Sequence, residues 1–456
     1  MHCVSGSPGH SNRMRQNDEY GYRSQESNSA LVASLFTASC QAPGLMETLD
    51  LVKPRTPGGL VSGCAPPTRM SIIRSRWIQD WLILISKARI RGGQLSTFGI
   101  EEEFILADRS TLLPASPTKQ QKNALMALSS HSGRVTTEWL DCQIEYATPV
   151  LRTASEAFES LLDFRKKLSR TAHELGLIAT SLGTAPQIAD APPAISEGER
   201  YREMATLAPA IAAEQFINGM HVHVGIPDRE SGVLALNGMR RWLPVLTALS
   251  ANSPLWRGAD SGFASWRSIQ YRRWVIYGTP PHFHNADDYD CHLTALQRSD
   301  LVDDEAMVGW LVRLSPRHQT VEIRSCDVQL HAEDALTLAL LIRALVNAEI
   351  ESPLANAVPA ELIDVAHWQA ARFGLAGKLM DTQAQNSVPA ATAVWTMFDR
   401  ALPGLLRSGD EVRVRAGIRR LLRFGTGATR QREVFARAGL SGLLKYSSSR
   451  LAAHDT

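Results

Sequence analysis

The segment at residues 99–104, which reads Gly-Ile-Glu-Glu-Glu-Phe, constrains this chain more than any other. The apolar residues around it predict a β-strand over residues 97–106. Side chains alternate between the two faces of a strand, so Glu101 and Glu103 would share one face and Glu102 would point to the other. Two carboxylates on one face repel each other, and burial would raise their pKa values. Such a face needs solvent or a cation above it, and a solvated edge strand would explain this motif by itself.

A second strand candidate covers residues 143–150 and places Glu145 between Ile144 and Tyr146, where one face would lie in a core. Glu138 and Asp141 precede this strand, and we expect them in a turn. Taken alone, an isolated acid in such a strand is more often paired with an arginine than bound to a metal ion.

A third strand candidate, residues 220–226, contains the sequence His-Val-His, which places His221 and His223 on one face. Two histidines at this spacing can bind a metal ion, but a hydrogen-bonded pair in a core would give the same pattern. Gly219 and Gly225 flank the pair, and glycine in a strand often marks the close approach of another backbone or a ligand.

A fourth strand candidate, residues 320–325, places Glu322 and Arg324 on one face and Val321 and Ile323 on the other. A same-face or cross-strand ion pair would explain this motif alone. Four strands that each present acids or histidines on a single face are harder to explain by solvation. Carboxylate-rich sites suit hard cations such as Mg²⁺ or Mn²⁺. Because an arginine fork matches phosphate oxygens, an arginine beside such a site suggests phosphoryl transfer.

The rest of the chain supplies the helices of a mixed α+β domain. The sequence Thr153-Ala-Ser-Glu156 is a capping box, and it begins a helix that we expect to end at Gly176. We also expect helices over 233–249, with a kink or boundary at Pro244, over 333–351, and from residue 369 to the end. The arginines of the last region are expected to form a solvated helix face; they include Arg413, Arg415, Arg419 and Arg420.

Composition excludes several classes of protein. The 48 Lys and Arg residues nearly balance the 46 Asp and Glu residues, which gives no electrostatic footprint for nucleic acid or an anionic membrane. The densest apolar run near the N-terminus, residues 81–85, is far shorter than the ~20 residues of a helical span. Six cysteines without a Cys-x-x-Cys pair argue against a disulfide framework, and residues 1–30 lack an export-signal pattern. We therefore expect a cytoplasmic protein.

The first part of the chain differs in composition from the rest. Of its first 69 residues, 22 are Gly, Ser or Pro, the level at which a sequence reads as low complexity. We expect residues 1–93 to be an N-terminal extension, largely disordered or misannotated, with Met46 and Met70 as alternative start sites. A short helix over 70–92 would close this extension. Residues 94–450 would then form one catalytic domain.

The ordered set of motifs resembles the carboxylate–amine ligase family, whose members are often labelled glutamate–cysteine ligase type 2, within the glutamine-synthetase-like superfamily. The resemblance covers about residues 98–445. One departure is Ala185, where the family often has a histidine. The motifs that carry the resemblance are GIEEE at 99–103, QIEYAT at 143–148, GMHVHVG at 219–225, LSANSP at 249–254 and TVEIR at 320–324.

The resemblance implies a glutamine-synthetase-like fold, an antiparallel sheet with helices on its outer face and a concave face that holds ATP and Mg²⁺ or Mn²⁺. It implies that ATP phosphorylates a side-chain carboxylate, that of glutamate in the reference reaction. The amine of cysteine then attacks, giving γ-glutamylcysteine, ADP and phosphate. Arg324 would contact the transferring phosphoryl group. The implied metal ligands are Glu101, Glu103, Glu138, Glu145, His221 and Glu322.

Three further residues are candidates for binding substrate or ATP: His223, Arg257 and Arg267. The two arginines flank the motifs at 253–254 and 263–265, and surface ion pairs would explain them equally well. We expect small-molecule substrates and no nucleic-acid or membrane partner. The sequence leaves open whether the chain forms a homo-oligomer. The alternatives to a ligase are a guanidino-kinase-like phosphotransferase and a non-catalytic metal-binding relative. A zinc hydrolase built on His221 and His223 fits less well, because zinc sites favour nitrogen and sulfur ligands.

Overall fold

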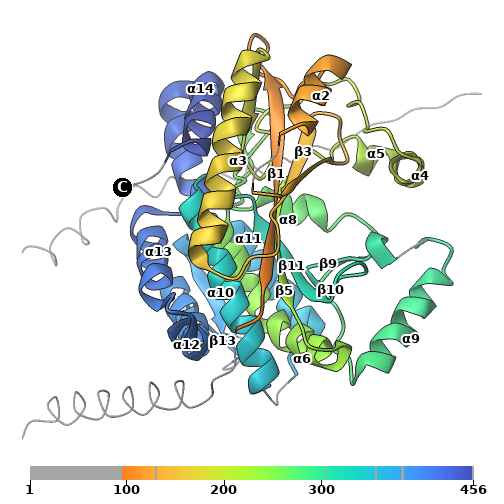
Figure 1. Ribbon diagram of the computed structural model, residues 1–456, viewed down its shortest axis with the longest axis vertical. Coiled ribbons are helices and arrows are strands. Elements are labelled where there is room, and N and C mark those ends of the chain that lie inside the picture. The colour runs from red at the N-terminus through yellow and green to blue at the C-terminus, as the bar shows by residue number, and fades with distance from the viewer. Residues whose placement is uncertain (1–94, 129–130, 303–304, 355–356, 382–384, 454–456) are drawn as a thin grey trace, which may run out of the picture. The chain divides into compact units, whose positions relative to one another are not determined.

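The protein is represented by a computed structural model that describes residues 95–128, 131–302, 305–354, 357–381 and 385–453 (Figure 1). Its central feature is a seven-stranded antiparallel sheet in the order β10–β11–β5–β1–β3–β2, with β4 paired to the end of β1. The strands are β1 (Phe98–Asp108), β2 (Arg134–Thr137), β3 (Gln143–Ala147), β4 (Leu177–Thr180), β5 (Gly219–Gly225), β10 (Val312–Leu314) and β11 (Thr320–Asp327).

Alternation along these strands gives the sheet two different faces. Phe98, Ile100 and Phe104 of β1 point to one face and are buried in apolar clusters. The apolar residues of β5 and β11 join the same cluster as Phe98 and Ile100. The opposite face carries Glu101 and Glu103, which is the arrangement that the period of two predicts.

Helices cover the apolar face in two layers. The inner helices are α3 (Ala154–Glu174), α6 (Arg229–Met239), α7 (Leu243–Ser250) and α10 (Ala332–Glu351). Figure 1 shows α3 running alongside β1, and the ring of Phe164 from α3 stacks on Tyr146 of β3 at 4.0 Å between centroids. Behind α10 lie α12 (Ala390–Ser408) and α13 (Glu411–Phe424). The mostly apolar sequence of α10 follows from this position between two layers.

The remaining elements surround the open face and the ends of the sheet. The helices are α2 (Lys119–Met126), α4 (Glu199–Leu207), α5 (Pro209–Ala212), α8 (Trp266–Tyr271), α9 (Ala286–Gln297), α11 (Ala360–Phe373) and α14 (Gly427–Leu451). Three small pairings complete the described strands: β6 (Leu255–Trp256) with β7 (Ala259–Asp260), β8 (Tyr277–Gly278) with β9 (Gly309–Trp310), and β12 (Lys378–Asp381) with β13 (Asn386–Pro389).

Most of the elements expected from the sequence are confirmed. The four strands that carry acids and histidines exist. The capping box at Thr153 begins α3, and Oε2 of Glu156 accepts from the backbone N–H of Thr153. The four arginines at 413, 415, 419 and 420 in α13 are exposed or partly exposed, and two of them pair with acids, as expected of a solvated face. Across the described residues, none of the helices is long and apolar enough to cross a lipid bilayer.

One boundary is slightly displaced and one expectation about helices is wrong. The boundary expected at Pro244 in the segment 233–249 is present slightly earlier, at a 3₁₀ turn (Arg240–Trp242) that separates α6 from α7, and Pro244 lies in the first turn of α7. Proline is tolerated there because the first helical N–H groups have no partner within the helix. The region after residue 369 is not helical throughout, because β12 and β13 form a hairpin within it. The extension 1–93 and its helix lie outside the described residues.

Candidate active site

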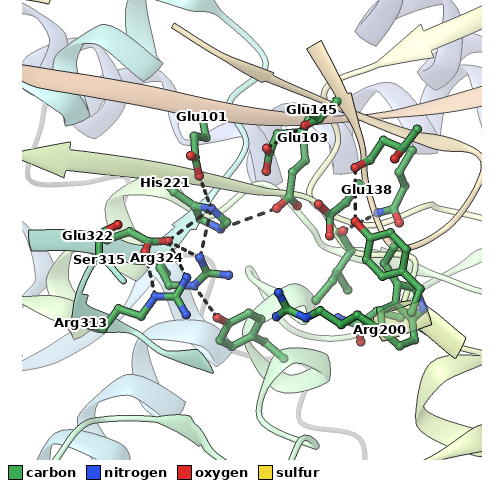
Figure 2. A pocket seen from close by; sticks show the side chains of 18 of the residues that line it. Glu101, Glu103, Glu138, Glu145, Arg200, His221, Arg313, Ser315, Glu322 and Arg324 are labelled. Carbon is green, nitrogen blue, oxygen red and sulfur yellow. Dashed lines mark hydrogen bonds and ion pairs between the residues drawn. The ribbon is translucent and has the colours of Figure 1, made fainter. Parts of the chain in front are cut away.

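The open face of the sheet forms the floor of a cavity of about 340 Å³. Strands β1, β2, β3, β5 and β11 contribute side chains to this floor, while α4, α8 and the β10–β11 turn form the walls. Figure 2 shows the carboxylates of β1 and β3 on one side and the arginines on the other. The structure therefore brings together the polar residues of the four strand motifs, which are separated by more than 200 positions in sequence.

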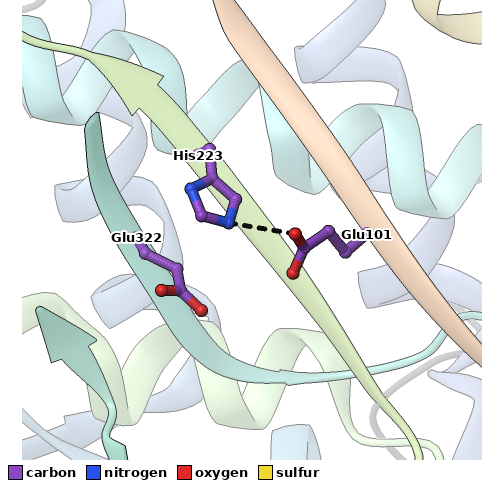
Figure 3. Close-up of side chains that lie close together, drawn as sticks. All are labelled: Glu101, His223 and Glu322. Atoms are coloured by element: carbon purple, nitrogen blue, oxygen red, sulfur yellow. Dashed lines mark ion pairs between the residues drawn. The ribbon is translucent and has the colours of Figure 1, made fainter. Parts of the chain in front are cut away.

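Glu101 lies between two histidines. It is paired across β1 and β5 with His221, and its Oε2 lies 3.2 Å from Nδ1 of that ring. Its Oε1 lies 3.3 Å from Nε2 of His223. Burial would raise the pKa of Glu101, but the contacts with His221 and His223 outweigh it and hold this pKa well below its ordinary value. Glu101 is thus an ionised carboxylate that touches both members of the His-x-His motif. Figure 3 shows its contact with His223.

Glu103, Glu138 and Glu145 form a second group, in which acids face acids. Glu103 and Glu145 are directly opposite in the β1–β3 pairing, and Glu138 follows the end of β2. Oε2 of Glu103 accepts from the backbone N–H of Gly219 at 2.5 Å, and Oε1 of Glu145 accepts from the hydroxyl of Thr136 at 3.1 Å. In the described part of the chain, no lysine or arginine forms an ion pair with any of these three acids.

This crowding changes the protonation of the group. Burial, followed by the charge of Glu103, raises the pKa of Glu138 to about 8. Burial and the charges of Glu101, Glu138 and Glu103 raise the pKa of Glu145 well above its ordinary value. These acids therefore hold protons that a cation would displace, because a divalent ion reverses the sign of the local interaction.

Glu322 is held by two arginines instead. Its Oε2 accepts from Nε of Arg313 at 2.8 Å, and its Oε1 accepts from Nη1 of Arg324. Burial opposes ionisation, but the charges of Arg313 and Arg324 hold the pKa of Glu322 well below its ordinary value. Nε of Arg324 donates to the hydroxyl of Tyr271 at 2.9 Å, which fixes the guanidinium at the edge of the cavity (Figure 2).

Arg267 and Arg257, the two arginine candidates, have different surroundings. Arg267 is 2% exposed, lines the cavity and lies over the ring of Tyr271. Its Nη2 crosses β5 where Gly219 leaves room, since a β-carbon at Gly219 would lie 2.3 Å from that nitrogen. Arg257 is half exposed, pairs with Glu214 at 2.7 Å and does not line the cavity. The structure thus places only Arg267 at the site.

Three sets of side chains offer ligand atoms that lie within 4.8 Å of one another. The structural test of a metal site is the state of these donors. Nε2 of His221 is buried without a hydrogen-bond partner in the described part of the chain, and burial with the charge of Arg324 lowers the pKa of this ring. A neutral imidazole among carboxylates fits Mg²⁺ or Mn²⁺. The sets are Glu101–His223–Glu322, Glu101–Glu145–His221 and Glu103–Glu138–Glu145.

Sequence reasoning missed several residues of the cavity. Arg313 holds Glu322 but belongs to a three-residue strand that has no alternating pattern. Its only signal is the short polar turn at 315–319, which indicates a hairpin that would place Arg313 opposite Glu322. Tyr271 reaches the cavity from α8, and nothing in its local sequence indicates this. Arg200 reaches it from α4 (Figure 2).

Comparisons with known proteins agree with this architecture. Residues 97–448 match the family model described as Glutamate-cysteine ligase family 2 (GCS2). A protein of Mycolicibacterium vanbaalenii named "Putative glutamate--cysteine ligase 2-2" is 34% identical over 348 residues, which is 75% of this chain and 94% of that protein. A protein of the same name from Saccharopolyspora erythraea is 37% identical, over 77% of this chain and 90% of that protein.

Solved structures show the same fold at low sequence identity. Glutamate–cysteine ligase from Francisella tularensis, solved in complex with AMP, superimposes with a TM-score of 0.61 at 12% identity, over 80% of this chain and 90% of that chain. A bifunctional glutathione synthetase from Pasteurella multocida gives 0.60 at 16% identity, over 81% of this chain and 53% of that chain. The expected α+β fold, an antiparallel sheet with helices on its outer face, is confirmed, and these solved structures share it.

Proposed function

The chain belongs to the glutamate–cysteine ligase family 2, and from this premise we propose that it is an ATP-dependent carboxylate–amine ligase. The observation that carries the proposal is the convergence of five glutamates, two histidines and two buried arginines on the open face of one antiparallel sheet. Carboxylates in such number attract divalent cations, and arginines bind phosphate, so the site has the groups that phosphoryl transfer requires.

In the proposed reaction, an oxygen of the acid substrate attacks the γ-phosphorus of ATP, and the bond to the β–γ bridging oxygen breaks to release ADP. The amine nitrogen then attacks the acyl carbon, phosphate leaves with its oxygen, and the nitrogen loses a proton. Bound Mg²⁺ or Mn²⁺ would neutralise the triphosphate. We propose as its ligands Glu101, Glu103, Glu138, Glu145, His221 and Glu322.

The arginines would act on the anionic substrates. Arg324 is fixed by Tyr271 at the cavity edge, where it can donate to oxygens of the phosphoryl group in transfer. Arg267 and His223 would bind substrate or ATP, because both line the cavity. We leave Arg257 out of the proposed site, because it pairs with Glu214 away from the cavity.

For the substrates we propose glutamate and cysteine, giving γ-glutamylcysteine, on the basis of the names that the relatives carry. We further propose that residues 94–450 form the catalytic domain, that the enzyme acts in the cytoplasm, and that its partners are these small molecules. The substrate pair is the most specific part of the proposal, because the family and the fold support a ligase without specifying its substrates.

The test is a screen of amino-acid pairs with ATP and Mg²⁺, scored by phosphate release and by mass detection of the new amide. We expect phosphate release that requires both an acid and an amine, with Glu322→Gln as the inactive control. ADP release with an acceptor alone and no amide would instead support a phosphotransferase. Absence of Mg²⁺-dependent ATP turnover across the whole panel would support a non-catalytic relative.

A further inference from the structure

Arg267 differs from Arg313 and Arg324, two other arginines of the cavity, in having no hydrogen-bonded carboxylate in the part of the chain that the structure describes. Arg313 and Arg324 both donate to Glu322. Arg267 instead donates through Nη2 to the backbone oxygen of Arg324 at 3.3 Å, and its Nε is buried without a partner among the described residues. A buried guanidinium with an unused N–H group in a cavity has its charge available for an anion.

Asp327, at the end of β11, is the acid nearest to this guanidinium. Its Oδ1 lies 3.9 Å from Nη1 of Arg267, which is too long for a hydrogen bond, and the carboxyl group is 1% exposed. Asp327 is not among the residues that line the cavity. Asp327 therefore lies close enough to attract the guanidinium but does not itself line the cavity.

The carboxylate of Asp327 joins the two backbone segments that present Arg267. Oδ2 accepts from the backbone N–H of Asn252 at 2.8 Å and from the hydroxyl of Ser253 at 2.7 Å. Oδ1 accepts from the hydroxyl of Ser265 at 2.9 Å. Ser265 is the N-cap of α8, and Ser253 Oγ accepts from the backbone N–H of Arg267 at 3.0 Å. Ser253 and Ser265 thus link Asp327 to the start of the helix that carries Arg267.

The surrounding backbone leaves space for this network. A β-carbon at Gly183 would lie 3.0 Å from Oδ2 of Asp327 and 3.0 Å from Cβ of Ser253. Gly183 also donates its backbone N–H to Asn252 at 3.0 Å, so the loop after β4 closes over the carboxylate. Asp327 is therefore enclosed by three segments: the loop after β4, the segment at 252–253 and the start of α8. Together these contacts hold the first turn of α8 in place.

We propose that Asp327 is a positioning residue, which acts through Ser253 and Ser265 to hold Arg267 as the buried anion-binding group of the cavity. The ligand group is a phosphate or carboxylate oxygen. This inference rests on the proposed function, in which ATP and the acid substrate are the anions. Replacing Asp327 by Asn puts an NH₂ group where one carboxylate oxygen now accepts hydrogen bonds, so at least one donor loses its partner.

The experiment measures binding of two probes to the full-length protein by calorimetry: adenosine 5′-(β,γ-imido)triphosphate with Mg²⁺, and L-glutamate. We expect Asp327→Asn to weaken one of them by about tenfold, the effect of losing one charge-assisted contact. The affected probe identifies the anion as phosphate or carboxylate. Unchanged affinity for both probes would overturn the inference.

A double-variant test separates positioning from general destabilisation. If Asp327 acts through Arg267, then Asp327→Asn in an Arg267→Lys background changes the affinity by less than about threefold. If the two residues acted independently, the fold-changes in affinity of the two single variants would multiply in the double variant. The matched control is Asp410→Asn, which removes another buried carboxylate, bound to Arg343 at 2.5 Å in a helix-packed region. It should lower Tm and leave both affinities unchanged; a change equal to that of Asp327→Asn would overturn the inference.

Two further outcomes are informative. If Asp327→Asn does not fold, Ser265→Ala removes one donor and should weaken the same probe in the same direction, and no change there would overturn the inference. If the unaltered protein binds a probe but forms no amide, the proposed function fails. The positioning role is then still tested by the ratio of probe affinities between the unaltered protein and Asp327→Asn. If the unaltered protein binds neither probe, both proposals fail.

Discussion

Glu102 and its neighbours Glu101 and Glu103 follow one another in β1, yet the two faces of the sheet give them opposite surroundings. On the helix face, both oxygens of Glu102 accept from Arg165, at 2.9 and 2.5 Å, and both side chains are completely buried. The remaining donors of Arg165 reach the backbone oxygens of Gln329 and Leu330. On the open face, Glu103 opposes Glu145 with no arginine between them.

The comparison shows that burial of a charge does not by itself indicate function. Glu102 is the more deeply buried acid, but its charge is balanced and all its hydrogen bonds are made within the protein. The acids around Glu103 are partly exposed and unbalanced, and burial and mutual repulsion raise the pKa values of Glu138 and Glu145. An excess of like charge that the protein does not neutralise is what marks the second face as a binding site.

The largest expected effect tests the open face. Glu101→Gln should lower ATP turnover by about 10³-fold or more, because stabilisation by a bound metal is worth several kcal/mol of barrier. Folding should be retained, since Gln keeps hydrogen-bonding groups toward His221 and His223. Steady-state phosphate release and thermal unfolding measure the two quantities. Turnover within tenfold of the unaltered protein would contradict the assignment of Glu101.

The closed face should respond in stability rather than in activity. Glu102→Gln leaves Arg165 buried with one neutral partner, and breaking a buried ion pair costs about 3–5 kcal/mol of unfolding free energy. Denaturant unfolding measures the loss, and turnover per folded molecule should stay near that of the unaltered protein. The double variant Glu102→Leu with Arg165→Met should recover part of the stability, because neither charge is then left alone. A large loss of turnover in folded Glu102→Gln would contradict the conclusion that the helix face serves stability and the open face serves activity.

Arg324 tests whether the arginine side of the cavity acts on the reacting group. Arg324→Ala should lower kcat by about 10²- to 10³-fold, or ~3 kcal/mol, as expected for one donor to a developing charge. The KM for ATP should change less, because the contact strengthens in the transition state. Arg324→Lys, which keeps the charge without the fork, should recover only part of kcat. Equal effects on kcat and on nucleotide affinity would argue for simple binding.

The smallest effect concerns pH in the metal-free protein. The pKa of Glu138 is about 8 when folded and lies near its ordinary value of 4.5 when unfolded. Between these values the folded state holds the additional proton, so stability falls as pH rises through the window, by at most about 1.4 kcal/mol per pH unit. His221 and His223 shift in opposite directions near pH 6.5, so the difference between the unaltered protein and Glu138→Gln isolates this group.

Mg²⁺ should reverse this dependence. Because a bound cation favours the ionised carboxyl group, metal binding should release protons at pH 6–8, and calorimetry in buffers of different ionisation enthalpy measures the number released. Glu138→Gln should release fewer protons than the unaltered protein. Metal binding without proton release from the unaltered protein would contradict the raised pKa of Glu138.

The sequence predicted the elements whose patterns are local. Alternation identified β1, β3, β5 and β11, and the Thr153 capping box identified α3. The same alternation separated Glu102 from its neighbours before the structure did. The roles of the acids as metal ligands stay predictions, but their convergence in one cavity is observed.

The features that sequence reasoning missed depend on contacts between distant segments. Arg165 gives no sign in α3 that it will balance Glu102, 63 positions away. Arg313 lies in a strand too short for a period to be visible. The contacts of Asp327 are with the segment at 252–253 and the start of α8 at 265–267, which lie far from it in sequence. The break between α6 and α7 was expected at Pro244 and lies slightly earlier, because both halves are apolar and their composition does not fix its exact position.

At Gly219, a single hydrogen stands where every other amino acid has a carbon. A β-carbon there would meet Nη2 of Arg267 at 2.3 Å and Nε2 of His221 at 2.9 Å. Even alanine would therefore displace a proposed anion-binding group and disturb a proposed metal ligand in one step, while the hydrophobic side of the sheet would be untouched. This position is thus a diagnostic for other sequences of this fold. A relative with a larger residue there would keep the sheet and helices but lose this arrangement of the arginine and the histidine, and with it the proposed activity.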